Sequence, residues 1–167
     1  MTFYEEIYKL KTIIRKGWQE RDVQGRVESD AEHTFSMALL GLEIMSKNKL
    51  KLDELKVLKM IIYHELCEID VGDITPFDKV SKEDKFNKEH ACIKRISKDF
   101  NMPEIENIWL EFEECLTSEA KFVKKLDKYD AVLQSQIYAE SQNKPELYLE
   151  FKNFSKSICD DMEKYKL

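Results

Sequence analysis

The apolar positions along this chain recur at helical spacing and predict helices from one end to the other. Successive apolar residues near the amino terminus lie three or four positions apart, which places them on one face of a first helix. This first stripe consists of Phe3, Ile7, Leu10, Ile14 and Trp18. The last helix is predicted from a stripe with the same period, formed by Leu147, Phe151, Phe154, Ile158, Met162 and Tyr165. No segment predicts a convincing strand.

Ser29 and Glu32 mark the start of a second helix. A serine followed three residues later by glutamate forms a capping box, in which the two side chains satisfy free backbone N–H groups at the helix start. The apolar stripe that carries this helix consists of Phe35, Leu39, Leu42 and Met45. The capping box therefore sets the boundary at residue 29.

Further caps and prolines divide the rest of the chain. Asp53 is expected to cap a third helix, which ends near Gly72. Residues 73–76 must leave this helix, because Pro76 disfavours helix at the residue before it. Later starts are marked by Ser81 with Asp84 three residues on, by Pro103 and by Ser118. We therefore predict an all-α fold of about six or seven helices.

Composition and length support one helical domain over residues 1–167. The chain has 4 Gly and 3 Pro among 36% charged and 43% hydrophobic residues, which favours long helices over strands and turns. No repeat, low-complexity tract or linker marks a domain boundary. The cysteines Cys67, Cys92, Cys115 and Cys159 are far apart and form no C-x-x-C pair. We therefore expect neither disulfides nor a structural zinc site.

The charge of the chain excludes one class of partner. A formal net charge of −6 repels nucleic-acid polymers, although a few local cations can still hold a small anionic ligand. The start, residues 1–6, lacks a basic region followed by an apolar run, and no stretch approaches the roughly 20 apolar residues of a membrane span. We expect a soluble, cytoplasmic protein without a membrane partner.

Titratable residues interrupt the apolar face of the predicted third helix. His64 and Glu68 continue the inward row of Val57 and Ile61, while Glu65 continues the neighbouring row. Buried carboxylates without a partner are costly. This cluster should therefore be neutralised by a proton, a cation or a metal ion.

Two other helices contribute the same kinds of side chain. Asp127 shares a face with Ala120 and Val123, and His33 lies in the first turn of the second helix. Imidazoles and carboxylates together suit a divalent metal ion. The residues alone leave a second interpretation open, a helical scaffold in which the inward carboxylates pair with lysines. The candidate lysines are Lys88, Lys121 and Lys124.

Several ordered blocks resemble the HD-domain phosphohydrolases, in particular the small single-domain branch that contains the 5'-deoxynucleotidases. The blocks are Arg15–Trp18, Glu28–His33, His64–Glu68, Gly72–Pro76, Lys85–Glu89 and Glu119–Asp127. The resemblance implies a single HD domain that binds one divalent ion, which could be Co, Mn, Mg, Zn, Ni or Fe. The implied metal ligands are His33, His64, Glu65 and Asp127.

The resemblance also implies an activity and further site residues. The expected reaction is hydrolysis of nucleoside 5'-monophosphates, above all deoxynucleotides, to nucleoside and phosphate. Glu68 is the implied acid or base and Arg15 the phosphate-binding arginine. Trp18 is the implied aromatic residue of the substrate pocket, and Asp73 is expected to meet the sugar. Members of this branch are often dimers, which implies a homodimer.

Glu65 departs from the family pattern, because an aspartate usually follows the histidine. The additional methylene moves the carboxylate by about 1.5 Å, so an alternative function is a catalytically weakened nucleotide-binding or regulatory module. His90 is the only histidine between the second and last implied ligands, which favours a mononuclear site with His90 on the surface. Ile69 replaces the second acidic residue of the similar guanosine tetraphosphate hydrolases and argues against that activity.

Overall fold

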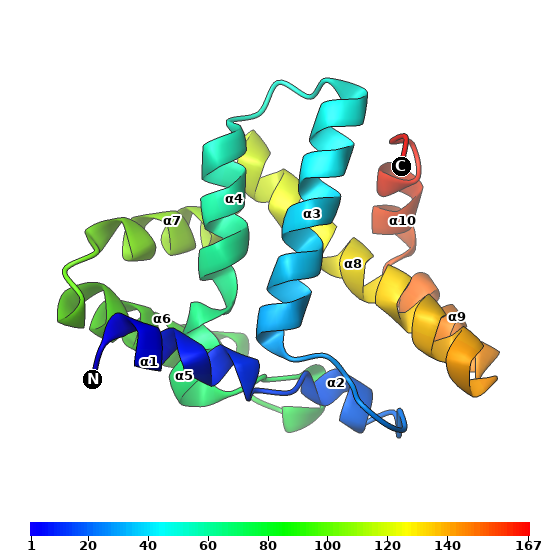
Figure 1. Cartoon of the computed structure of the whole chain (residues 1–167), viewed down its shortest axis with the longest axis horizontal. Coiled ribbons are helices and arrows are strands. Elements are labelled where there is room, and N and C mark those ends of the chain that lie inside the picture. The colour runs from blue at the N-terminus through cyan, green and yellow to red at the C-terminus, as the bar shows by residue number, and fades with distance from the viewer.

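The computed structural model describes all residues 1–167 and consists of helices joined by short connections, with no strand (Figure 1). The α-helices are α1 (Phe3–Tyr8), α2 (Lys16–Gln19), α3 (Asp30–Asn48), α4 (Glu54–Tyr63), α5 (Glu68–Val71), α6 (Lys82–Asp99), α7 (Pro103–Glu114), α8 (Ser118–Gln142), α9 (Pro145–Phe154) and α10 (Lys156–Met162). Short 3-10 helices are η1 (Lys9–Lys11), η2 (His64–Cys67) and η3 (Pro76–Asp78). None of the helices combines the length and the apolar composition that a membrane span needs.

Helix α8 is the central element of the bundle. It passes behind α3 and α4 in Figure 1 and also packs against α7, α9 and α10. The main core fills the space between α3, α4 and α8, with Met37, Ile61 and Leu126 fully buried. Gly41 permits the close approach of α3 and α8, because a Cβ atom there would lie only 3.0 Å from Leu126 Cδ2.

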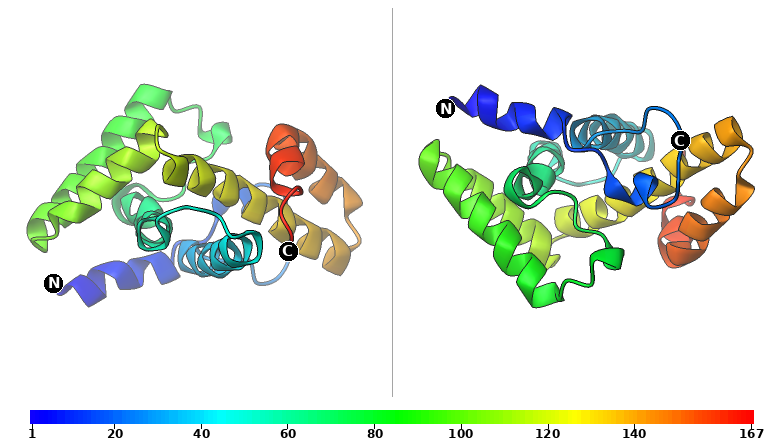
Figure 2. Two further views of the ribbon diagram at one scale, coloured as in Figure 1. Left: turned by 90° about the horizontal axis from the view of Figure 1, so that it is seen from above. Right: turned by 90° about the horizontal axis from the view of Figure 1, so that it is seen from below.

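Two smaller cores lie on either side of this centre. Helices α6 and α7 pack together on one side of the bundle, with Ile96 and Trp109 buried between them. On the other side, α9 packs along the end of α8, and both contribute to a cluster that includes Trp18 and Leu147 (Figure 2). Helix α8 therefore joins both sides of the protein.

Most of the predicted helix starts are confirmed. The Ser29 side chain accepts a hydrogen bond from the Glu32 backbone N–H and completes the capping box, and Asp53 and Ser81 cap α4 and α6. Pro103 is the first residue of α7. The prediction for α8 was wrong by one residue, because Thr117 rather than Ser118 caps this helix.

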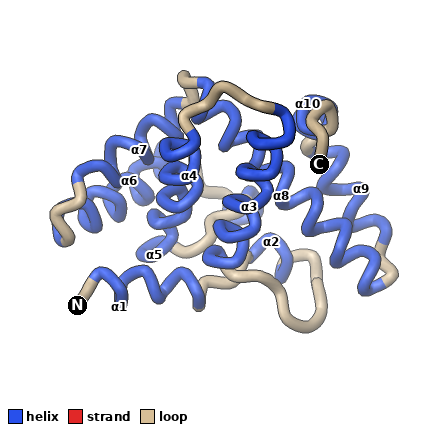
Figure 3. The backbone as a smooth tube through the Cα atoms, turned by 45° about the horizontal axis from the view of Figure 1, so that its top comes forward, coloured by secondary structure: helices blue, strands red, loops and turns tan.

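The first predicted helix is interrupted. Residues 13–15 are not helical and pair instead with residues 28–30 through backbone hydrogen bonds. The Arg15 N–H donates to the Glu28 carbonyl at 3.1 Å, and the Asp30 N–H donates to the Ile13 carbonyl at 3.0 Å. Figure 3 shows the resulting long connection between α2 and α3. This pairing fixes the position of Arg15 at the start of α2.

Two other predicted helices are also divided. The backbone tightens from α4 into η2 at His64, continues as α5 and ends at Gly72, which has a φ of 69°. The last predicted helix is broken at Ser155 into α9 and α10. These breaks explain why the chain has more helical segments than the six or seven expected.

The predicted buried face of the second helix was wrong in part. Phe35 is 67% exposed and Leu39 is also exposed, whereas His33, Met37 and Gly41 lie on the buried side. The inward row predicted for Ile62 was wrong as well, because this side chain is exposed. In both helices, an apolar row at helical spacing faces away from the core.

Candidate metal centre

Four titratable side chains from three elements meet beside the core. His33 comes from the first turn of α3, His64 and Glu65 come from η2, and Asp127 comes from the middle of α8. One ligand atom from each side chain lies within 4.8 Å of the others, and all four residues are buried. The fold thus brings together all four residues that the sequence resemblance implied as metal ligands.

The hydrogen bonds of the two histidines leave one nitrogen of each ring free. His64 Nδ1 lies 2.7 Å from the Ile61 carbonyl oxygen, which can only accept, so Nδ1 is the donor. His33 Nδ1 lies 2.8 Å from Asp130 Oδ2 in the same kind of contact. Both Nε2 atoms are buried without a hydrogen-bond partner. Metal-binding histidines commonly have this arrangement, with one nitrogen anchored and the other free to coordinate.

The distances between the donor atoms fit a divalent ion. Glu65 Oε1 lies 3.1 Å from His64 Nε2 and 3.6 Å from His33 Nε2, and Asp127 Oδ1 lies 3.3 Å from His33 Nε2. Ligands bound at roughly 2.0–2.2 Å around one ion lie about 3–3.5 Å from each other. The four side chains can therefore share one ion with little movement.

Both carboxylates of this cluster are ionised at neutral pH. Burial raises the pKa of Glu65, but the nearby His64 and Arg15 outweigh burial and hold the pKa well below its ordinary value. Burial opposes ionisation of Asp127 too, but Lys128 and His33 keep its pKa low. The cluster therefore offers two negative ligands.

His33 holds a proton when no metal competes for the ring. Burial lowers the pKa of His33, but the neighbouring carboxylates of Asp127 and Asp130 outweigh it and raise the pKa to about 9. A metal ion that binds to Nε2 must displace this proton.

Glu68 lies beside the cluster in a different electrostatic environment. Burial raises the pKa of Glu68 well above its ordinary value, and the negative charges of Glu65, Asp30 and Asp73 raise it further. Burial also raises the pKa of Asp30 to about 7. The pKa of Glu68 is therefore shifted in the opposite direction from that of Glu65, only three residues away.

Arg15 and Asp73 lie at the edge of the same cluster. The Arg15 guanidinium donates to Glu65 Oε1 at 2.7 Å, and this arginine also attracts Asp127 and Asp73 electrostatically. Asp73 Oδ2 accepts a hydrogen bond of 2.7 Å from the Lys16 backbone N–H. Their predicted roles toward phosphate and sugar stay predictions.

Trp18 lies outside the cluster of candidate ligands, in the smaller core that includes Leu147. Its side chain is 2% exposed, its ring stacks on Phe151 at 4.7 Å between centroids, and its Nε1–H donates to Glu28 Oε1 at 2.9 Å. Contact between the indole and a substrate would require this packing to open. This hydrogen bond connects the indole to Glu28, which lies beside His33 and Asp130.

The remaining histidine and the cysteines do not contribute ligands. His90 stacks on Trp109 and contacts Glu106 Oε1 through Nε2 at 2.9 Å. It is half-buried rather than on the surface as expected, and it lies apart from the four candidate ligands. All four cysteines are free, in agreement with the sequence.

The three lysines considered as partners of these carboxylates do not contact them. Lys124 pairs with Glu113 at 2.5 Å, and neither Lys88 nor Lys121 forms an ion pair. The lysine that contacts the cluster is instead Lys128, whose Nζ lies 3.0 Å from Asp127 Oδ2.

Sequence reasoning also missed Asp130 and Asp30. Asp130 had a usable signal, because residues three apart on a helix lie on the same face and Asp127 was already a candidate. Asp30 had no such signal, because an acidic residue in the first turn of a helix is usual on the surface. Its complete burial depends on the pairing of residues 28–30 with residues 13–15.

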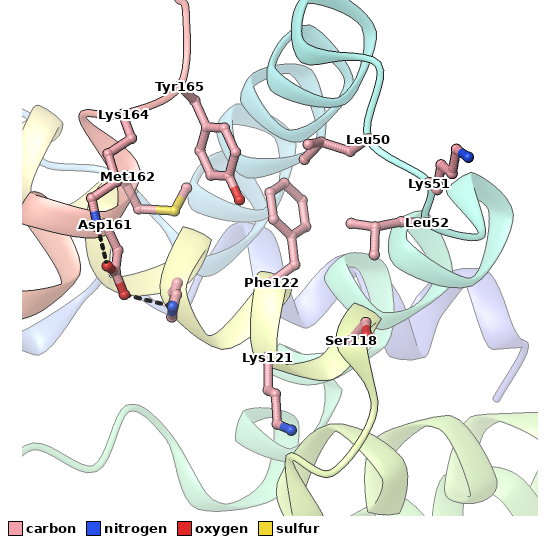
Figure 4. Close-up of a pocket in the computed structure, with 11 residues that line it drawn as sticks. Leu50, Lys51, Leu52, Ser118, Lys121, Phe122, Asp161, Met162, Lys164 and Tyr165 are labelled. Atoms are coloured by element: carbon pink, nitrogen blue, oxygen red, sulfur yellow. Dashed lines mark hydrogen bonds and ion pairs between the residues drawn. The ribbon is translucent and has the colours of Figure 1, made fainter.

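A surface hollow of about 510 Å³ lies between the α3–α4 connection, the start of α8 and the carboxyl terminus (Figure 4). Phe122, Tyr165, Leu50 and Leu52 line its apolar part, and lysines surround it. None of the four candidate ligands lines this hollow. The donor atoms, rather than this hollow, therefore locate the candidate site.

The fold and the donor set define an all-helical protein with a buried nitrogen-and-oxygen centre for a divalent metal ion. Comparison with known proteins agrees, because residues 7–166 match the HD domain. The chain belongs to the HD-domain family.

Named relatives and solved structures cover nearly the whole chain. The 5'-deoxynucleotidase HDDC2 of Dictyostelium discoideum is 33% identical over 162 residues, which cover 92% of this chain and 85% of that protein. The protein of the same name from Homo sapiens is 32% identical over 148 residues, or 87% of this chain and 71% of that protein. A conserved hypothetical protein from Pyrococcus furiosus has a similar structure, with a TM-score of 0.73, 27% identity and coverage of 96% of this chain and 97% of the other.

Proposed function

We propose that this protein is a metal-dependent phosphomonoesterase that hydrolyses nucleoside 5'-monophosphates, with deoxynucleotides preferred, to nucleoside and phosphate. The observation that carries the proposal is the pair of free Nε2 atoms on His33 and His64 facing the carboxylates of Glu65 and Asp127. The 5'-deoxynucleotidase relatives support the substrate class.

The four residues of the cluster and Arg15 have different roles in the proposed reaction. His33, His64, Glu65 and Asp127 would hold one divalent ion, which would lower the pKa of a bound water and polarise a phosphoryl oxygen. Arg15, already next to Glu65, balances the negative charge that develops on the phosphate.

Glu68 supplies the proton that the leaving group needs. The attacking water oxygen would form a bond to phosphorus and release one proton, and the bond from phosphorus to the 5'-oxygen would break. The 5'-oxygen would take up the proton of Glu68, and the proton released by the water would restore Glu68. A carboxyl group with a raised pKa is suited to donate this proton, and burial and the neighbouring carboxylates raise the pKa of Glu68 well above its ordinary value.

Phosphate release tests this function directly. Protein reconstituted in turn with Co, Mn, Mg, Zn, Ni and Fe is incubated with every ribonucleoside and deoxyribonucleoside 5'-monophosphate. We expect turnover with at least one metal and faster release from the deoxynucleotides. If metal-loaded protein binds nucleotides and releases no phosphate from any of them, the alternative of a catalytically weakened nucleotide-binding module is correct.

Metal binding should depend on pH through His33. Below the pKa of about 9, the metal-free ring carries a proton that the ion must displace. The affinity should therefore rise by about tenfold per pH unit from pH 7 to 9 and level off above that range, because one proton leaves per ion.

Competition with a chelator at several pH values measures this dependence and also counts the ions. Saturation at one ion per chain is expected. A pH-independent affinity would show that His33 is not a ligand, and two ions per chain or none would contradict the mononuclear site.

We also infer a homodimer. Exposed apolar side chains on the outer sides of two neighbouring helices support it, namely Phe35 and Leu39 on α3 and Leu55 and Ile62 on α4. Side chains of this kind often mark protein contacts when they lie together. A mass of twice 19.9 kDa by light scattering is the expected result, and a monomeric mass at high protein concentration would contradict the inference.

A further inference from the structure

Lys128 lies on the solvent side of the metal-binding cluster. Its Nζ atom is 3.0 Å from Asp127 Oδ2, while Asp127 Oδ1 lies 3.3 Å from His33 Nε2. One oxygen of the Asp127 carboxylate thus faces the other donor atoms, and the second oxygen faces Lys128. The Lys128 side chain is 51% exposed, in contrast to the buried candidate ligands.

Arg15 occupies the corresponding position on the other carboxylate. Its guanidinium donates to Glu65 Oε1 at 2.7 Å. Two cations therefore flank the cluster, each in contact with a different carboxylate ligand. Because both groups are positively charged, they repel each other across the cluster.

We propose that Lys128 binds the phosphate group of the substrate together with Arg15. A phosphate monoester carries a charge of about −1.5 to −2 at pH 7, so an ester placed between the two cations replaces their repulsion with two attractions. This inference rests on the proposed function for the identity of the phosphate compound.

The geometry of Lys128 leaves it free for this role. An ammonium group has three donor positions, and Asp127 is the single carboxylate in contact with it. Adjacent residues on a helix point about 100° apart, so Lys128 reaches Asp127 only by bending its flexible side chain back toward the cluster. A half-exposed chain of this kind can rotate toward an incoming phosphate oxygen without disturbing the core.

Lys128→Gln and the matched variant Lys125→Gln separate this role from a general effect of charge. Lys125 lies one turn earlier on α8 and pairs with Asp161 at 2.6 Å, on the wall of the hollow in Figure 4. Both variants remove one positive charge from the same helix and break one ion pair. Lys128→Arg keeps the charge at the proposed position.

The measurements are KM and kcat with a deoxynucleoside monophosphate, and inhibition by inorganic phosphate and by the deoxynucleoside alone. Lys128→Gln should raise KM and the inhibition constant of phosphate by about tenfold, the expected cost of losing one charge-assisted contact. Inhibition by the deoxynucleoside, which has no phosphate, should stay unchanged. Lys128→Arg should remain within about threefold of the unmodified protein, and Lys125→Gln should leave all four quantities unchanged.

Three results would overturn the inference. Unchanged phosphate inhibition in Lys128→Gln would exclude contact with phosphate, and equal losses for phosphate and deoxynucleoside would indicate general damage to the site. A loss of bound metal would show that Lys128 serves to hold Asp127. If the unmodified protein hydrolyses no nucleotide but binds inorganic phosphate in a Lys128-dependent manner, the inference stands and the proposed function fails.

Discussion

Glu68→Gln should retain the metal ion and lose about 10²- to 10⁴-fold in kcat, the usual effect of removing a general acid or base. Glutamine has nearly the same shape as a protonated glutamate but cannot transfer the proton. Glu68 is not one of the four grouped donors around the two free imidazole nitrogens, so occupancy should not change. Phosphate release and elemental analysis of the same samples measure the two quantities.

Glu65→Gln is the matched variant, because it makes the same chemical change one turn away. Glu65 Oε1 lies 3.1 Å from His64 Nε2 and also accepts the hydrogen bond from Arg15. Its replacement by a neutral amide should lower metal occupancy as well as rate. If Glu68→Gln empties the site while Glu65→Gln leaves it full, the two assignments must be exchanged.

The parts of this fold that follow from sequence are those determined by residues close together in the chain. Ser29 and Asp53 were identifiable as caps because their hydrogen-bond partners lie three residues away. The inward positions of His64 and Asp127 followed from helical periodicity alone, since each continues a row of buried apolar residues. The four-residue ligand set was implied by the resemblance of the ordered blocks to the HD-domain family.

Some features of the fold depend on contacts between segments that are distant in the chain, and the sequence could not predict these features. The break after η1 exists because residues 13–15 pair with residues 28–30, and nothing in the apolar stripe from Phe3 to Trp18 indicates it. The predicted burial of Phe35 and Leu39 was wrong for a related reason, because periodicity identifies an apolar face without showing what covers it. The chemistry on the opposite face of the same helix, at His33, was the more reliable guide.

The electrostatic roles also required the three-dimensional arrangement. The resemblance gave Glu65 and Glu68 different roles, but only the structure shows that the pKa of Glu65 is held well below its ordinary value and that of Glu68 well above it. The difference arises because His64 and Arg15 lie close to Glu65, whereas Glu68 is buried and lies close to the negative charges of Glu65 and Asp30. A metal ligand and a proton donor can therefore lie three residues apart.

Arg15→Ala should lower the rate by about 10²-fold or more, as expected when a group that stabilises charge in the transition state is removed. The backbone pairing of Arg15 with Glu28 places its side chain beside Glu65, and a shorter side chain cannot reach the phosphate from there. Arg15→Lys should recover part of the rate, because lysine keeps the charge but loses the planar pair of donors.

Arg26→Ala is the control for this substitution, because Arg26 is an exposed arginine whose partner is Glu32 on the surface of α3. Its kinetics should match those of the unmodified protein. Steady-state phosphate release from the three variants, with metal content measured in parallel, distinguishes loss of phosphate contact from loss of the ion. Unchanged kinetics in Arg15→Ala would mean that the arginine only neutralises Glu65, and that another cation beside the cluster meets the phosphate.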